Sequence, residues 1–188
     1  MLTVPNALSV LRLLCVGLFG WVLLGRHDDF AAAAILAALG ATDWIDGQVA
    51  RRFNQVSTLG KVLDPAADRV LVATAVVAGA VAGAIPVWLC VVVGIREAAV
   101  SGTVAVLGAL GAPRIDVVWA GKAGTLGLMF AFPLFLIGHD QGFSLHKTAE
   151  FLGWCCAIPA LILAWYAAIT YLPMARKALN DSRVDSSS

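Results

Sequence analysis

Long apolar stretches separated by short polar breaks constrain the fold of this chain more than any other feature. Six of them are each near the roughly 20 residues that a membrane-spanning helix needs, and they cover residues 8–24, 30–44, 62–84, 86–110, 119–137 and 151–172. Only 13% of the residues are charged and 60% are hydrophobic, which is too little polar surface to cover a soluble domain. We therefore expect an all-α integral membrane protein with six transmembrane helices.

The charge balance excludes further classes of protein. A formal net charge of +1 leaves no basic excess to neutralise phosphates, so no nucleic-acid partner is expected. The high hydrophobicity excludes a disordered chain. No break is long enough to hold a second domain, so we expect one membrane domain over residues 1–180 and a disordered tail over residues 181–188. The helical pattern of the second stretch continues through Phe53, which predicts a helix that extends out of the bilayer.

Basic residues predict the topology of this membrane domain. If both termini share one side, that side holds all of the 13 Lys and Arg residues except Arg26 and Lys147. Cytoplasmic loops carry an excess of Lys and Arg. The sequence therefore predicts a multi-pass protein of the plasma membrane with both termini in the cytoplasm.

Four aspartates lie at the predicted cytoplasmic ends of two apolar helices, where carboxylates are costly and point to function. Asp43 and Asp46 are three residues apart, and Asp64 and Asp68 are four apart, so each pair projects from one helix face. An antiparallel hairpin of the two helices brings the pairs together. Facing carboxylates repel unless a cation lies among them, and hard oxygen ligands suit Mg²⁺, Mn²⁺ or Ca²⁺. Two such ions form the clamp used in phosphoryl displacement.

The residues between the aspartates favour a bulky phosphorylated ligand. Gly47 and Ala50 offer no large side chain to block it, and Arg51 supplies a planar fork for a phosphate. Ordinary helix-end charges would explain one or two of the aspartates but not a pair in each helix. A cation transporter is an alternative from a different class, although the acids cluster at one face instead of crossing the bilayer. A structural membrane partner packing through Gly79-x-x-x-Gly83 is another.

The spacing of this segment resembles the signature of the CDP-alcohol phosphatidyltransferase family. The pattern is Asp-x-x-Asp-Gly-x-x-Ala-Arg, then eight residues, then Gly-x-x-x-Asp-x-x-x-Asp. The segment from Val4 to Ser9, followed by Arg12, also looks like the amino-terminal segment of the family, and the length of six helices agrees. Every fixed position of the pattern is matched, namely by Asp43, Asp46, Gly47, Ala50, Arg51, Gly60, Asp64 and Asp68.

The resemblance implies an enzyme of phospholipid biosynthesis that transfers a phosphatidyl group from CDP-diacylglycerol to an alcohol and releases CMP. It implies that Asp43, Asp46, Asp64 and Asp68 hold two Mg²⁺ or Mn²⁺ ions and that Asp68 is also the catalytic base. It further implies a homodimer. Asn6 and Ser9 have an alternative role as caps of the first helix. The implied contacts to CDP-diacylglycerol are Asn6, Ser9, Gly47, Ala50, Arg51 and Ser57.

The acceptor alcohol is the remaining question. Arg96, Arg114 and Lys122 are candidates for an anion-binding pocket beside the metals, although ordinary positive-inside charge also explains Arg114 and Lys122. Members of the family that use glycerol phosphate resemble one another in an Arg-Glu pair followed by a further Arg, and the second Arg is absent from residues 97–104. This departure favours phosphatidylglycerol as the acceptor and cardiolipin as the product, with glycerol 3-phosphate as the alternative.

Overall fold

The chain folds into long helices. A computed structural model describes residues 4–53, 60–109 and 119–185, and describes side chains over residues 11–42, 69–105 and 119–170. Within these ranges there are six helices and no strands, which confirms the all-α expectation and the extension of the second helix through Phe53. The helices are α1 (Val4–Gly25), α2 (Asp29–Phe53), α3 (Gly60–Val81), α4 (Val87–Ala109), α5 (Trp119–His139) and α6 (His146–Asp185).

Three of the described helices are long and apolar enough to cross a membrane. These segments are Val87–Ala105, Trp119–His139 and His146–Thr170. The apolar parts of α1, α2 and α3 that fall within the described side chains are shorter. Large apolar side chains face outward, with Trp21 57% and Ile162 64% exposed, as expected for surfaces that contact lipid. The helices therefore fit a membrane protein, and six complete spans remain a prediction.

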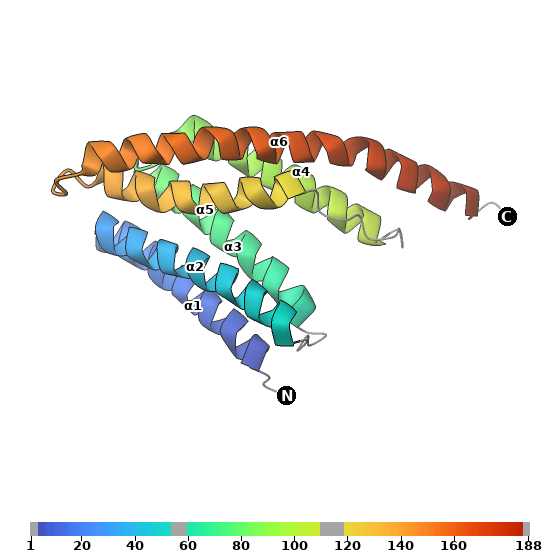
Figure 1. Cartoon of the computed structure of the whole chain (residues 1–188), viewed down its shortest axis with the longest axis horizontal. Helices are drawn as coiled ribbons and strands as arrows, with labels where there is room; N and C mark the ends of the chain where they lie inside the picture. The colour runs from blue at the N-terminus through green and yellow to red at the C-terminus, as the bar shows by residue number, and fades with distance from the viewer. Residues whose placement is uncertain (1–3, 54–59, 110–118, 186–188) are drawn as a thin grey trace.

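Successive helices run in opposite directions, so alternate helix ends gather at the two ends of the bundle (Figure 1). The start of α1, the end of α2 and the start of α3 lie at the same end as the end of α6. We call this the motif end, because it carries the termini of α2 and α3 at Phe53 and Gly60. The turns after α1, α3 and α5 lie at the opposite end.

Small residues allow α5 and α6 to pack along each other almost backbone to backbone. Buried alanines on α6, among them Ala160 and Ala164, face glycines on α5. A Cβ atom at Gly124 would lie 2.8 Å from the carbonyl oxygen of Ala160 and 2.8 Å from the backbone nitrogen of Ala164. Real side chains essentially never approach backbone so closely, so this contact requires glycine on α5.

Aromatic and polar contacts close the opposite end of the bundle. Trp154 of α6 stacks on Trp88 of α4 with ring centroids 5.7 Å apart, and meets Phe135 of α5 edge to face at 5.0 Å. Asp28 begins α2 as its N-cap, since its Oδ1 accepts a hydrogen bond of 2.9 Å from the backbone N–H of Ala31. The aromatic contacts join α4, α5 and α6, and the core of the bundle continues through α1, α2 and α3.

Two features differ from the expectations. Helix α6 continues to Asp185 and so includes residues 181–185, which we expected in a disordered tail. Among the described residues, the Gly79-x-x-x-Gly83 spacing serves the α3–α4 turn. A Cβ atom at Gly79 would lie 2.5 Å from the Cδ1 of Ile85, and Gly83 lies beyond the end of α3 with a φ of 75°, a conformation that favours glycine.

Candidate active site

The fold brings the two aspartate-bearing helix segments to the motif end of the bundle. Asp43 and Asp46 lie in the last turns of α2, and Asp64 and Asp68 lie in the first turns of α3. Since α2 and α3 run antiparallel, these segments meet at one end (Figure 1). The four side chains lie outside the described part, so their mutual geometry stays a prediction.

The predicted contacts to the nucleotide are distributed over the same end. Gly47, Ala50 and Arg51 lie on α2 after the first aspartate pair, and Asn6 and Ser9 lie in the first turns of α1. The start of α1 lies at the motif end, beside the end of α2 (Figure 1). Ser57 and Arg114 fall on residues outside the described ranges.

A cavity lies between α2, α3, α4 and α5, about one helical turn from the aspartates. Gly40 precedes Asp43 by three residues, and Leu71 follows Asp68 by three. One turn of α-helix rises about 5.4 Å. The cavity therefore lies about one turn from the predicted reaction centre along α2 and α3, toward the opposite end of the bundle. Its lining residues are Leu36, Gly40, Leu71, Val72, Ala75, Glu97, Thr125, Leu128, Met129 and Phe132.

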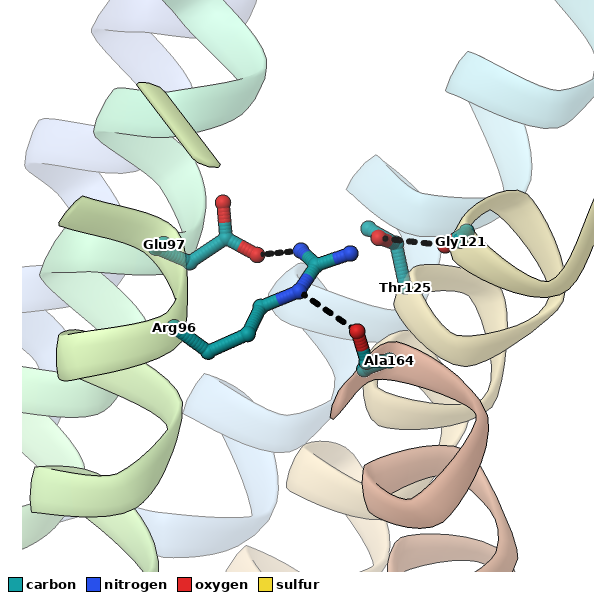
Figure 2. Close-up of polar contacts among 5 residues, drawn as sticks. All are labelled: Arg96, Glu97, Gly121, Thr125 and Ala164. Atoms are coloured by element: carbon teal, nitrogen blue, oxygen red, sulfur yellow. Dashed lines mark hydrogen bonds and ion pairs between the residues drawn. The ribbon is translucent and has the colours of Figure 1, made fainter. Parts of the chain in front are cut away.

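A partly buried ion pair stands beside this cavity (Figure 2). Arg96 of α4 forms a salt bridge from its Nη1 to the Oε1 of Glu97, the next residue on the same helix. Its Nε also donates a hydrogen bond of 3.4 Å to the backbone carbonyl of Ala164 on α6. Arg96 is only 5% exposed. The guanidinium therefore joins α4 to α6 within the protein and is engaged by protein groups on two sides.

Three helices converge at the level of this ion pair. Ala164, whose carbonyl accepts from Arg96, is also the residue whose backbone contacts Gly124 of α5. On α5 the hydroxyl of Thr125 donates a hydrogen bond of 3.1 Å to the carbonyl oxygen of Gly121 (Figure 2). The close contact between α5 and α6 thus fixes the carbonyl that orients Arg96.

The predicted anion pocket is only partly visible. Lys122 is exposed on the first turn of α5, whereas Arg96 is buried and paired with Glu97. Within the described side chains no contact joins Arg96 to Lys122. Arg12 is a second buried arginine, 7% exposed on α1. The charges expected to form one cluster therefore occupy different environments.

Glu97 is the residue that we did not predict. Its signal in the sequence is an acidic side chain adjacent to Arg96 in the middle of an apolar helix, and such residues are functional candidates by default. An anion-binding pocket is expected to use cations, so the sequence makes Arg96 a candidate for it and not Glu97. The long Arg96 side chain turns back to reach its neighbour, which only the structure reveals.

The donor chemistry of the site suits a divalent cation. Among the described side chains there is no group of three His, Cys, Asp or Glu residues that would hold a metal ion. The four motif aspartates lie outside that set, and their helix segments meet at one end of the bundle. Carboxylate oxygens from two helices are the ligands that Mg²⁺ and Mn²⁺ prefer.

Comparison with known proteins adds an independent line of support. Residues 2–172 match the sequence model of the CDP-alcohol phosphatidyltransferase family. The chain is 40% identical over 181 residues to the cardiolipin synthase (CMP-forming) of Streptomyces coelicolor, covering 94% of this chain and 84% of the relative. It is 29% identical over 184 residues to the CDP-diacylglycerol–glycerol-3-phosphate 3-phosphatidyltransferase of Bacillus subtilis, covering 88% and 93%. The corresponding protein of Shigella flexneri is 31% identical over 185 residues, covering 95% and 97%. The chain belongs to the CDP-alcohol phosphatidyltransferase family and is an enzyme of that class.

Proposed function

We propose that this enzyme transfers a phosphatidyl group from CDP-diacylglycerol to phosphatidylglycerol, forming cardiolipin and releasing CMP. The observation that carries the proposal is the 40% identity to a cardiolipin synthase over 94% of the chain. The relatives that use glycerol 3-phosphate are 29% and 31% identical. The absence of a further arginine from residues 97–104 agrees with a lipid acceptor.

Synthesis of phosphatidylglycerophosphate from glycerol 3-phosphate is the second candidate. Two relatives with that name align along nearly their whole length, covering 93% and 97% of their own chains. The two reactions share the donor, the leaving group and the attack by a glycerol hydroxyl. They differ in whether the acceptor carries a phosphate monoester or a diester, so the choice depends on the acceptor side of the site.

The four aspartates of the motif carry the chemistry in this proposal. The family is generally dependent on divalent metal ions, and Asp43, Asp46, Asp64 and Asp68 would hold two Mg²⁺ or Mn²⁺ ions. Such ions, when bound, offset the negative charge that develops on the diphosphate. Asp68 also takes the proton of the acceptor hydroxyl as its oxygen attacks, because the hydroxyl is a poor nucleophile while protonated.

The reaction exchanges one phosphorus–oxygen bond for another. The acceptor oxygen bonds to the phosphorus that carries diacylglycerol, the bond from this phosphorus to CMP breaks, and CMP leaves with the electron pair. Arg51 would bind the diphosphate as a planar fork, and Gly47 and Ala50 would leave room for the nucleotide. Ser57, Asn6 and Ser9 would complete the contacts to CDP-diacylglycerol.

The acceptor side of the site would lie toward α4 and α5. Arg114 and Lys122 are proposed to attract the phosphate of the acceptor from the motif end, with Arg96 behind them.

The proposal places the motif end at the cytoplasmic face of the plasma membrane, with both termini in the cytoplasm. There the donor keeps its acyl chains in the leaflet while its nucleotide reaches water. A homodimer is part of the proposal by resemblance to the family.

The test is CMP release by purified protein in detergent supplied with CDP-diacylglycerol and Mg²⁺. We expect release with phosphatidylglycerol, a product with the mass of cardiolipin, and loss of release on chelation that added Mg²⁺ or Mn²⁺ reverses. Serine and an acceptor-free reaction are the controls. Release only with glycerol 3-phosphate would favour the second candidate, and no release with any alcohol would contradict both.

A further inference from the structure

We propose that Glu97 recognises a hydroxyl of the glycerol headgroup of the acceptor, and that Arg96 positions Glu97 instead of binding phosphate. The carboxylate oxygen that Arg96 leaves free would accept a hydrogen bond from the headgroup. This inference rests on the transferase function proposed above and names the acceptor chemistry of the same site, namely an uncharged polyol.

The charge of Arg96 is already compensated within the protein. Its side chain is 6% exposed, one edge of the guanidinium pairs with Glu97, and its Nε donates to Ala164 at 3.4 Å. A guanidinium in this environment is held in one orientation by two helices. Since Glu97 neutralises it, Arg96 offers a phosphate much less attraction than a free arginine would.

The carboxylate of Glu97 has hydrogen-bonding capacity that the described residues do not use. Only its Oε1 has a partner among the described residues, and the second oxygen points away from Arg96 (Figure 2). An ionised carboxylate has room for about four hydrogen bonds. The side chain is 24% exposed and lines the cavity between α2, α3 and α5. A partly exposed carboxylate with an unused oxygen in an apolar bundle can accept a hydrogen bond from a ligand.

The other side chains that line the cavity do not offer a comparable hydrogen-bond acceptor. Most of its lining residues are aliphatic, aromatic or glycine. Thr125 carries the other side-chain oxygen of the lining, and its hydroxyl proton is already donated to the carbonyl of Gly121 at 3.1 Å. Glu97 is therefore the strongest hydrogen-bond acceptor among the residues that line the cavity.

The location of the cavity suits an acceptor that reacts at the aspartates. Gly40 and Leu71 place it about one helical turn, roughly 5.4 Å, from Asp43 and Asp68 along their helices. An acceptor headgroup between Glu97 and the motif would direct its secondary hydroxyl toward Glu97 and its primary hydroxyl toward the aspartates.

The electrostatics of the pair favour an uncharged group. Because Arg96 and Glu97 neutralise each other, neither a phosphate nor an ammonium group would gain much attraction from the pair. A hydroxyl needs only the free oxygen. Hydrogen bonds to charged groups are among the stronger ones in proteins, so losing this one should be measurable.

The experiment compares two acceptors that differ in one hydroxyl. Phosphatidylglycerol and phosphatidyl-1,3-propanediol share the phosphodiester and the primary hydroxyl, and the second lacks the secondary hydroxyl. We expect the wild-type enzyme, in mixed micelles at saturating CDP-diacylglycerol, to prefer phosphatidylglycerol by about tenfold or more in kcat/KM. In Glu97→Gln this preference should fall severalfold while the KM for CDP-diacylglycerol stays the same.

A second variant protects the test against misfolding. Glu97→Gln leaves Arg96 without its counter-charge, whereas the double variant Arg96→Met/Glu97→Met removes both charges together, a replacement that buried ion pairs often tolerate. We expect the double variant to treat the two acceptors alike. Thr125→Val is the matched control at the cavity wall, and it should retain the preference.

The outcomes separate this inference from the proposed function. If the wild type releases CMP but does not distinguish the two acceptors, or if the folded double variant keeps the wild-type preference, the role of Glu97 is wrong and the transferase function stands. Loss of turnover with both acceptors in a folded variant also contradicts it, since the proposal requires loss of preference. Absence of CMP release in the wild type with every alcohol refutes the transferase function itself.

Discussion

The contact between α5 and α6 and the meeting ends of α2 and α3 represent opposite ways of joining two helices. Gly124 and the buried alanines of α6 bring two backbones together with no polar side chain between them. Asp46 and Asp64 instead lie in the last turns of α2 and the first turns of α3. In the first region the protein is complete by itself, whereas in the second we propose that metal ions from outside the chain balance the charges.

This difference teaches which changes should affect stability and which should affect chemistry. A glycine contact has no function beyond packing, so its loss should weaken the bundle. The four carboxylates that we propose share one metal site would repel one another and so add nothing to stability by themselves. The ion pair of Arg96 and Glu97 lies between these extremes, because Ala164 belongs both to the packed contact and to the hydrogen bond that orients Arg96.

The largest effect is expected at the aspartates. Asp68→Asn removes the proposed base and one negative charge while keeping the shape of the side chain. CMP release should fall by at least about a hundredfold, which is the lower range for loss of a general base. Release is measured at saturating CDP-diacylglycerol and phosphatidylglycerol, beside the midpoint of thermal unfolding in detergent.

Asp140→Asn is the matched control, because it makes the same chemical change at the opposite end of the bundle. Asp140 accepts a hydrogen bond of 2.9 Å from the backbone N–H of Gly142 in the turn before α6. We expect CMP release to be retained in this variant. Full activity of Asp68→Asn would remove the base from the proposal, and a large fall in its unfolding midpoint would mean that the region is structural after all.

A change at the contact between α5 and α6 is expected to lower the stability of the bundle without acting directly on the reaction. Gly124→Ala forces a methyl group to within 2.8 Å of backbone atoms of Ala160 and Ala164. Overpacking of this kind costs about 1–3 kcal/mol. The unfolding midpoint in detergent should fall by several degrees, while the KM for CDP-diacylglycerol measured below that midpoint should stay unchanged.

Gly102→Ala separates the contact from the general effect of replacing glycine in a helix. Gly102 lies on α4, and a Cβ atom there would have no heavy atom within 4 Å. Replacing it should be neutral or stabilise the helix by up to about 1 kcal/mol. Equal behaviour of the two variants would show that α5 can move away from α6 without cost.

The sequence predicts the helices well because they depend on local patterns. Apolar length defines the six helices, and the continued periodicity through Phe53 gives the correct end of α2. The spacing of the four aspartates determines which of them share a helix face. These properties need only the geometry of one helix and the direction of the next.

What the sequence does not predict depends on contacts between distant residues. Arg96 and Ala164 are 68 positions apart, and nothing in the apolar stretch of α6 marks one carbonyl as the partner of an arginine. The Gly79-x-x-x-Gly83 spacing suggested a helix interface, but the first glycine accommodates Ile85 and the second forms a turn. Small residues permit a close approach without specifying which group approaches.

The smallest effect is expected at the opposite end, where a polar contact joins two helices without participating in the reaction. His139 at the end of α5 lies 2.7 Å from the Oδ2 of Asp29 at the start of α2, with the rings of Phe30 and Phe143 5.6 Å apart nearby. The His139 side chain is 43% exposed, and exposed pairs contribute little because water screens them. A double-mutant cycle of His139→Ala and Asp29→Ala should give a coupling energy below about 1 kcal/mol, with CMP release unchanged.

The cycle cancels the separate effect of Asp29 on the start of α2. A coupling above about 2 kcal/mol, or loss of CMP release, would mean that this end controls the geometry of the motif end, because α2 carries both the Asp29 contact and the first aspartate pair.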